Sequence, residues 1–158
     1  MFFGTFEHSL DAKNRLFVPK KFLEAIDSES ERQSFYVVKG FERCLFLYCK
    51  STWFQLVKHI REQSNLGDPN ARNFARLFFP TAEAVSCDKQ RRVVIPDALK
   101  RYAGLDREVV VLGVDERMEI WDRRSWAEFN ESQDKGLDQY AFEVLGTRPE
   151  PGATPPKG

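Results

Sequence analysis

Short runs of apolar and β-branched residues, separated by polar turns, recur along this chain. The runs at residues 35–40 and 44–48 flank a glycine-containing turn, and those at 109–113 and 118–121 repeat that arrangement. Aromatic and β-branched residues on both sides of such a turn are typical of a β-hairpin. The pattern therefore predicts two similar hairpins.

A second pattern also occurs twice, and it carries basic residues. Residues 11–19 and 88–96 each read Asp-x-x-x-Arg, then three apolar residues, then proline, with the two aspartates 77 positions apart. Because each polar cluster interrupts two strand-like runs, we expect a hairpin tip that holds cationic side chains clear of the sheet. The prolines introduce helical patterns at 20–26 and 97–103, since proline suits the first position of a helix.

Each half of the chain ends in a second predicted helix. Residues 52–55 and 125–128 fit a capping box, and Trp53 and Trp126 occupy the same position in the two copies. We expect these tryptophans to pack in the core or at a subunit interface. Each half reads strand, strand, helix, strand, strand, helix, which indicates an internal duplication whose halves share one barrel-like core.

The patterns divide the chain into five parts. We expect a first repeat at residues 5–52, a helical connector at 53–80, a second repeat at 82–125, a C-terminal helical region at 126–146 and a disordered tail at 147–158.

The connector contains one predicted helix, at residues 70–78. Asp68 is its candidate N-cap, and a proline follows in the first turn. Phe74, Leu77 and Phe78 have the spacing of one helix face. We expect that face to pack on the barrel or on a neighbouring subunit.

Composition and charge limit the possible functions. The chain has 158 residues, 42% of them hydrophobic, which is enough for one well-packed core. Its formal net charge is zero, whereas a domain that grips DNA usually has an excess of lysine and arginine. The two repeated turns are nevertheless locally positive, with sums of +1 and +2. In the first turn, the charges of Lys13, Arg15 and Asp11 add up to +1. In the second turn, those of Lys89, Arg91, Arg92 and Asp88 add up to +2.

Several other classes of protein find no support in the sequence. No apolar run reaches the roughly 18 residues of a membrane span and no signal peptide is visible, so we expect a cytoplasmic protein without a membrane partner. Cys44, Cys49 and Cys87 form no CxxC pair, and together with His8 and His59 they match no zinc signature. We expect no metal, no cofactor and, since no catalytic motif occurs, no enzymatic activity.

The duplicated motif resembles that of the MraZ family of bacterial regulators, and each half resembles a SpoVT-AbrB domain. Residues 1–4, 76–79 and 103–105 also agree with the family, and the likeness extends over roughly residues 1 to 145. The resemblance implies an α+β, mainly β fold. Its centre would be a duplicated SpoVT-AbrB barrel of the swapped-hairpin, double-psi-like kind, with flanking helices.

The same resemblance implies a function. MraZ proteins are known as ring-shaped homo-oligomers that bind repeated boxes in double-stranded promoter DNA. The implied role is transcriptional control of the division and cell wall gene cluster, including the protein's own promoter, with the protein located on the nucleoid. The alternative is a SpoVT-AbrB-type antitoxin or protein-interaction module, in which an extra tail grips a partner protein.

We expect the repeated turns to form the DNA-binding site. Arginine can engage a phosphate or a guanine edge with two hydrogen bonds, whereas lysine acts mainly as a point charge. The expected DNA-binding residues are Arg15, Lys13, Arg92, Arg91 and Lys89. Asp11 and Asp88 would orient the turns, since phosphate repels carboxylates. In a second interpretation, which stays open, each arginine pairs with its own aspartate and only holds the turn together.

One departure from the family pattern concerns the residue before each motif arginine. The family usually has glycine there, whereas this chain has Asn14 and Arg91. Asparagine tolerates a left-handed backbone well, but for arginine that conformation costs more. We therefore expect the second tip to adopt a different turn from the first.

Overall fold

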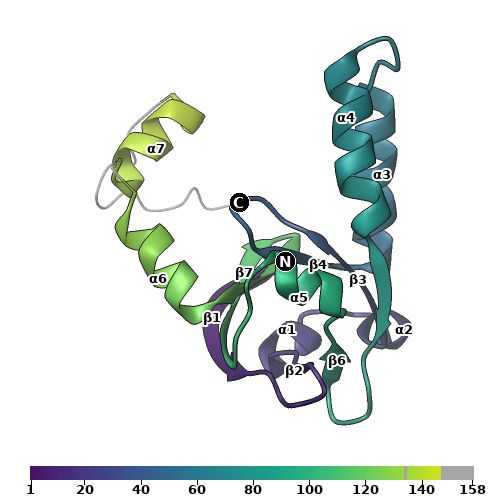
Figure 1. Ribbon diagram of the computed structural model, residues 1–158, viewed down its shortest axis with the longest axis vertical. Helices are drawn as coiled ribbons and strands as arrows, with labels where there is room; N and C mark the ends of the chain where they lie inside the picture. The colour runs from purple at the N-terminus through teal and green to yellow at the C-terminus, as the bar shows by residue number, and fades with distance from the viewer. Residues whose placement is uncertain (134, 147–158) are drawn as a thin grey trace, which may run out of the picture. The chain divides into compact units, whose positions relative to one another are not determined.

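Two antiparallel sheets form the centre of the fold in the computed structural model, which describes residues 1–133 and 135–146 (Figure 1). A six-stranded sheet has the order β1-β7-β8-β4-β3-β5, and a two-stranded sheet pairs β2 with β6. The strands are β1 (Phe2–Ser9), β2 (Arg15–Phe17), β3 (Ser34–Lys39), β4 (Leu45–Cys49), β5 (Glu83–Ser86), β6 (Arg92–Val94), β7 (Glu108–Asp115) and β8 (Arg117–Asp122). The helices are α1 (Lys20–Glu24), α2 (Glu29–Arg32), α3 (Lys50–Gln63), α4 (Pro69–Phe78), the 3-10 helix η1 (Phe79–Thr81), α5 (Asp97–Tyr102), α6 (Arg123–Glu131) and α7 (Leu137–Leu145).

Strands from the two halves of the chain pair with each other in both sheets. β1 of the first half pairs with β7 of the second, β5 of the second half pairs with β3 of the first, and β2 pairs with β6. β4 and β8 meet at the centre of the six-stranded sheet, so the two halves occupy equivalent places on either side of it. The predicted α+β, mainly β fold with an internal duplication is confirmed.

One hydrophobic core joins the two sheets and the short helices. Leu16 and Val93 face each other in the β2–β6 pair and are 1% and 0% exposed. Phe22 of α1 and Leu99 of α5 belong to the same cluster, as does Met118 of β8. Because each half contributes only part of this cluster, neither half can bury its apolar faces alone.

The predicted hairpins are confirmed in one place and wrong in another. Residues 35–40 and 44–48 form the hairpin β3–β4, and β7–β8 is its counterpart. The tips predicted at the Asp-x-x-x-Arg motifs are not hairpin tips, because β1 and β2 pair with β7 and β6 rather than with each other. Each turn instead connects the two sheets, since every half completes its hydrogen bonding on strands of the other half.

The capping boxes predicted at residues 52–55 and 125–128 are also wrong, because α3 and α6 begin before them, directly after β4 and β8. In α6 the Asp122 carboxylate accepts two first-turn backbone N–H groups, at 3.1 and 3.3 Å. In α3 the Glu31 carboxylate, from α2, accepts the backbone N–H and the hydroxyl of Ser51 at 3.0 and 3.1 Å. Acceptors outside the predicted boxes therefore satisfy the helix starts.

Helices α3 and α4 extend away from the sheets (Figure 1). Trp53 of α3 is buried, and its ring stacks on that of Tyr36 in β3 with 5.5 Å between centroids. Phe78 of α4 lies 5.9 Å from Trp53, and Phe74 stacks on Phe78. Leu77 is 73% exposed, so only part of the apolar face predicted for this helix packs on the fold.

The chain divides into two compact units, Met1–Trp126 and Ala127–Gly158. The first contains both sheets. In the second, α7 ends at Leu145 and is capped by Gly146, whose φ of 73° is left-handed and whose N–H donates to the Phe142 carbonyl oxygen at 2.8 Å. The tail predicted to be disordered, residues 147–158, lies outside the described residues.

Two general properties follow from the described ranges. None of their helices is long and apolar enough to cross a membrane. Within residues 1–133 and 135–146, no three histidine, cysteine, aspartate or glutamate side chains are grouped so that they could hold a metal ion.

Leu16→Ala should lower the free energy of unfolding by about 2–5 kcal/mol, because it opens a cavity in the core that both halves share. Urea unfolding followed by tryptophan fluorescence measures the change. The control is Phe17→Ala at the next position, where the side chain is 44% exposed and a loss below about 1 kcal/mol is expected. Equal losses would contradict the inward placement of Leu16.

Candidate nucleic-acid interface

The first Asp-x-x-x-Arg turn is built around the carboxylate of Asp11. Its Oδ1 accepts the backbone N–H groups of Lys13 and Arg15, both at 2.9 Å. The backbone closes through the Asn14 N–H, which donates to the Asp11 carbonyl oxygen at 3.0 Å, and the Asp11 N–H, which donates to the Arg15 carbonyl oxygen at 3.2 Å. The aspartate side chain therefore supplies acceptors that the bent backbone cannot supply itself.

The second turn repeats this arrangement bond for bond. Oδ1 of Asp88 accepts the backbone N–H groups of Gln90 and Arg92, both at 2.9 Å. The Arg91 N–H donates to the Asp88 carbonyl oxygen at 2.9 Å, and the Asp88 N–H donates to the Arg92 carbonyl oxygen at 2.8 Å. The prediction that the second tip adopts a different turn is wrong.

Both turns contain a left-handed residue that is not glycine. The φ angle is 58° at Asn14 and 63° at Arg91. The Arg91 carbonyl oxygen accepts the Val18 N–H, and the Asn14 carbonyl oxygen accepts the Ile95 N–H, both at 2.8 Å. Each turn is thereby fixed by the other half of the chain, which holds Arg91 in a conformation that costs about 1–2 kcal/mol for a residue with a side chain.

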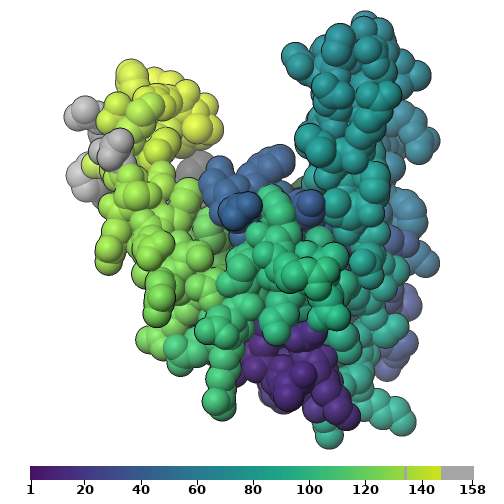
Figure 2. Space-filling model, in the orientation of Figure 1, coloured from purple at the N-terminus to yellow at the C-terminus, as the bar shows by residue number. Residues whose placement is uncertain are grey.

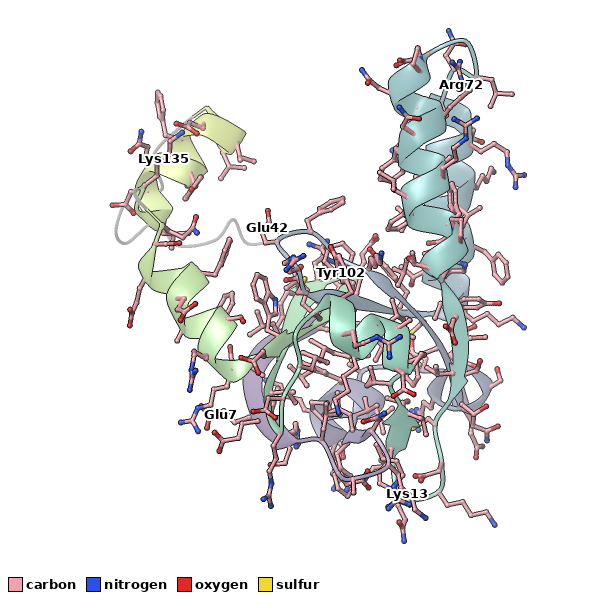
Figure 3. The ribbon with its side chains drawn as sticks, in the orientation of Figure 1. Glu7, Lys13, Glu42, Arg72, Tyr102 and Lys135 are labelled. Carbon is pink, nitrogen blue, oxygen red and sulfur yellow. The ribbon has the colours of Figure 1, made fainter. Side chains whose placement is uncertain are left out.

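These crossed hydrogen bonds place both turns at one end of the first unit, beside the β2–β6 pair (Figures 1 and 2). Lys13 lies at the extremity of this end (Figure 3). Lys13, Lys89 and Arg91 are all exposed. Within the part of the chain that the structure describes, these three cationic side chains have no hydrogen bond or ion pair, so they are available to an anionic partner.

Each motif arginine pairs with its own aspartate through Nε. Arg15 Nε donates to Asp11 Oδ2, and Arg92 Nε donates to Asp88 Oδ2 at 2.9 Å. The second interpretation, in which each arginine pairs with its own aspartate, is therefore correct as far as the Nε nitrogen is concerned. The terminal nitrogens of the two guanidinium groups make no further hydrogen bond to the described residues, and the side chains are 31% and 20% exposed. The aspartate orients the arginine and leaves a pair of donors that can meet a phosphate or a guanine edge.

Hydrogen bonding also keeps the two aspartates ionised. The backbone N–H of Arg15 is the main cause that lowers the pKa of Asp11, followed by the Arg15 side chain and the Lys13 N–H. Arg92 and Gln90 lower the pKa of Asp88 in the same way. An ionised carboxylate only accepts hydrogen bonds, which suits partners that are all donors.

The helices beside the two turns differ. At the first turn, the Asn14 side chain donates to Asp97 at 2.7 Å and accepts from Lys100 at 2.9 Å, so it is tied to α5. At the second turn, Arg91 lines a groove beside α1 together with Lys20 and Lys21. These lysines are not among the expected DNA-binding residues. Their position directly after Pro19 was visible in the sequence, but their closeness to the second turn depends on how the halves cross.

Known proteins of one family match this chain. The model of the MraZ protein family, which is described as antitoxin-like, matches residues 1–77 and 78–143. The chain belongs to the MraZ family. Two successive matches to one family model agree with the internal duplication, and the family suggested by the repeated motif is confirmed.

Proteins named transcriptional regulator MraZ align with most of this chain. The protein from Acetivibrio thermocellus is 36% identical over 141 residues, which cover 89% of this chain and 94% of the relative. The Clostridium acetobutylicum protein is 40% identical over 132 residues, covering 84% and 89%. The Pediococcus pentosaceus protein is 42% identical over 147 residues, covering 92% and 97%.

Arg91→Gly should raise the free energy of unfolding by up to about 1 kcal/mol. Glycine adopts the left-handed backbone without a side-chain clash, and its greater freedom in the unfolded chain offsets part of that gain. Chemical unfolding measures the change. Gln90→Gly is the control, because φ is not positive at this neighbouring position, and it should lose about 0.5–1 kcal/mol. A similar loss for both variants would contradict the left-handed turn.

Acid should weaken both turns once the pH falls below the ordinary aspartate range, near 3.9. Because the pKa values of Asp11 and Asp88 are lowered in the folded state, the unfolded chain binds more protons there. The stabilisation is therefore complete above that range and is lost as the pH falls through the lower, folded-state pKa values. Carbon-13 resonances of the two carboxyl groups measure the titration. Midpoints equal to that of aspartate in an unstructured peptide would show that the hydrogen bonds do not favour the ionised form.

Proposed function

We propose that this chain is a DNA-binding transcriptional regulator that contacts double-stranded DNA through its two Asp-x-x-x-Arg turns. The observation that carries the proposal is the pair of arginines, each held through Nε at the same end of the first unit. The name of the relatives, transcriptional regulator, supports it. Phosphate contacts position a protein on DNA and base contacts specify the sequence, and an oriented guanidinium can make either.

The proposal gives each residue of the turns a role. Arg15 and Arg92 contact base edges or phosphates, and Asp11 and Asp88 orient them without touching DNA. Lys13, Lys89 and Arg91 neutralise phosphates at the rim of the contact. The proposed repeats at residues 5–52 and 82–125 each supply one turn, and neither needs a cofactor or a catalytic step.

Assembly would explain how a chain with no net charge holds DNA. A single subunit neutralises few phosphates, and the electrostatic part of binding scales with their number. A ring-shaped homo-oligomer would present the turns repeatedly to spaced promoter boxes, and such linkage raises avidity by about 10²–10⁴. The proposed targets are the boxes upstream of the division and cell wall gene cluster, including this protein's own promoter, so the protein would act in the cytoplasm on the nucleoid.

The alternative function is a SpoVT-AbrB-type antitoxin or protein-interaction module. The family description, antitoxin-like, favours it. So does α7, on which Leu137, Val144 and Leu145 are exposed, because exposed apolar side chains on one short helix are typical of a partner-binding segment. If α7 serves only such a partner, replacing these three residues with serine would abolish partner capture and leave DNA binding unchanged.

Arg15→Ala and Arg92→Ala should each weaken binding to the DNA upstream of the protein's own gene by about 5- to 150-fold, the equivalent of one lost bidentate contact of about 1–3 kcal/mol. A gel shift at fixed salt measures the affinity. Arg61→Ala, which removes an exposed arginine from α3, controls for the change in net charge. Arg15→Lys should not restore specificity, because lysine lacks the paired donors.

Two outcomes would count against the proposal in different ways. Wild-type protein that gives no specific shift even at low salt would remove DNA binding at this promoter. Wild-type binding that survives both alanine substitutions unchanged would leave DNA binding in place but remove the motif arginines from it.

A further inference from the structure

The two turns have the same backbone conformation but differ in the charge of the side chains around them. Asp11 and Asp88 are 77 positions apart, and the hydrogen bonds that cross between the halves keep the same spacing: Val18 to Arg91 in one direction and Ile95 to Asn14 in the other. Positions 77 apart are therefore structural equivalents around the turns. This equivalence allows the surface beside one turn to be compared with the surface beside the other.

A groove of about 490 Å³ lies beside the second turn, between it and α1. Its charged residues are Lys20, Lys21, Glu24 and Arg91, three cations and one carboxylate, for a net charge of +2. Lys20 lies 3.4 Å from Glu24, but both side chains are well exposed, so this pair neutralises little. The groove therefore presents a positive surface next to the tip of the second turn.

The walls of this groove are mostly apolar. They are formed by Phe6, Phe17, Val18 and Pro19, with His8 between them. The cations stand at the rim of these walls and are exposed to solvent, so an anion can reach them from outside. Nε2 of His8 is buried and has no hydrogen-bond partner among the described residues, and burial lowers the pKa of the ring. His8 is thus a neutral reporter group inside a cationic groove.

The equivalent surface beside the first turn has no such excess of positive charge. Asp97 stands in the place of Lys20, Ala98 in that of Lys21, Arg101 in that of Glu24, and Glu83 in that of Phe6. Asn14 replaces Arg91 and is bonded to Asp97. Lys100, in the place of Leu23, donates to the Asn14 side chain. Two carboxylates and two cations give a net charge of 0, so a phosphate is attracted less here than beside the second turn.

We infer that the groove between the second turn and α1 binds the phosphate backbone of DNA, and that the two turns have unequal roles. The second turn, extended by Lys20 and Lys21, is the main phosphate contact. The first turn, flanked by Asp97, positions Arg15 for a contact with DNA to which attraction between charges contributes less. The inference rests on the proposed DNA-binding function and adds to it the residues that contact the phosphate backbone of the DNA.

The double variant Lys20→Ala/Lys21→Ala tests the inference through the salt dependence of DNA binding. Removing two phosphate contacts should make the slope of log K against log salt shallower by about 1.8 per bound subunit. The ratio of specific to non-specific affinity should stay the same, because phosphate contacts carry no sequence information. Lys20→Arg/Lys21→Arg should keep the wild-type slope, since the charge is retained.

A matched control is available on α3. Lys58 forms an exposed pair with Glu62 four residues on, as Lys20 does with Glu24, and Lys50 is another exposed lysine of the same helix. Lys50→Ala/Lys58→Ala removes the same charge and should leave the slope unchanged. If both double variants change the slope equally, the effect is one of net charge and the inference is overturned.

The imidazole of His8 gives an independent readout. Its nitrogen-15 and proton resonances should shift when wild-type protein binds promoter DNA, and should not shift in Lys20→Ala/Lys21→Ala at the same occupancy of DNA. Inorganic phosphate at the same phosphate concentration should cause a smaller shift than DNA. Equal shifts with DNA and inorganic phosphate would assign the groove to a free anion and overturn the inference.

Failure of the inference can be distinguished from failure of the proposed function. If wild-type protein binds promoter DNA and the Lys20→Ala/Lys21→Ala variant keeps its full salt slope, only the role of the groove is wrong. If wild-type protein does not bind DNA, the proposed function fails and the inference fails with it.

Discussion

One backbone hydrogen bond ties each turn of this protein to the opposite half of the chain. The Val18 N–H donates to the Arg91 carbonyl oxygen of the second turn, and the Ile95 N–H donates to the Asn14 carbonyl oxygen of the first. They extend the short β2–β6 pair at both of its ends and hold the left-handed residue of each turn in place. Without them, β2 and β6 would be three-residue strands with little to fix their register. The shared core and the position of both turns depend on this crossing.

The crossing also explains why the turns can present their arginines in a fixed direction. The Asp11 and Asp88 carboxylates are anchored by backbone N–H groups, so the oxygen that meets Nε has a defined position. The arginines lose side-chain freedom during folding rather than when a partner binds. Ordering a long side chain costs about 1.5–2 kcal/mol, and a contact that is already oriented avoids that cost on binding.

The bonds that maintain the turns come from the backbone and from the two aspartates, which leaves the neighbouring side chains free to differ between the copies. Arg91 and Asn14 occupy equivalent positions with nearly the same φ, although one side chain is a cation open to solvent and the other is bonded to α5. Lys20 and Asp97 are likewise equivalent positions, 77 apart, whose side chains carry opposite charges. A duplicated scaffold inside one chain can therefore carry two surfaces of unequal charge, which two identical subunits could not do.

Much of this architecture could be predicted from local sequence. The Asp-x-x-x-Arg repeat identified both turns, the aspartates that organise them and the duplication, because these features depend on residues within a few positions of one another. The hairpins β3–β4 and β7–β8 were likewise visible in the alternation of apolar and turn residues. The family membership followed from the same motifs.

Only the tertiary structure decided how the halves combine. Nothing in the sequence around Asp11 or Asp88 indicates that the flanking strands pair across the halves, since strand partners far apart in the chain are chosen by the burial of both sheet faces together. The left-handed conformation of Arg91 also depends on the tertiary structure, because the hydrogen bond from Val18 offsets part of what that conformation costs an arginine. The groove beside α1 exists for the same reason, since it unites Lys20 and Lys21 of one half with Arg91 of the other.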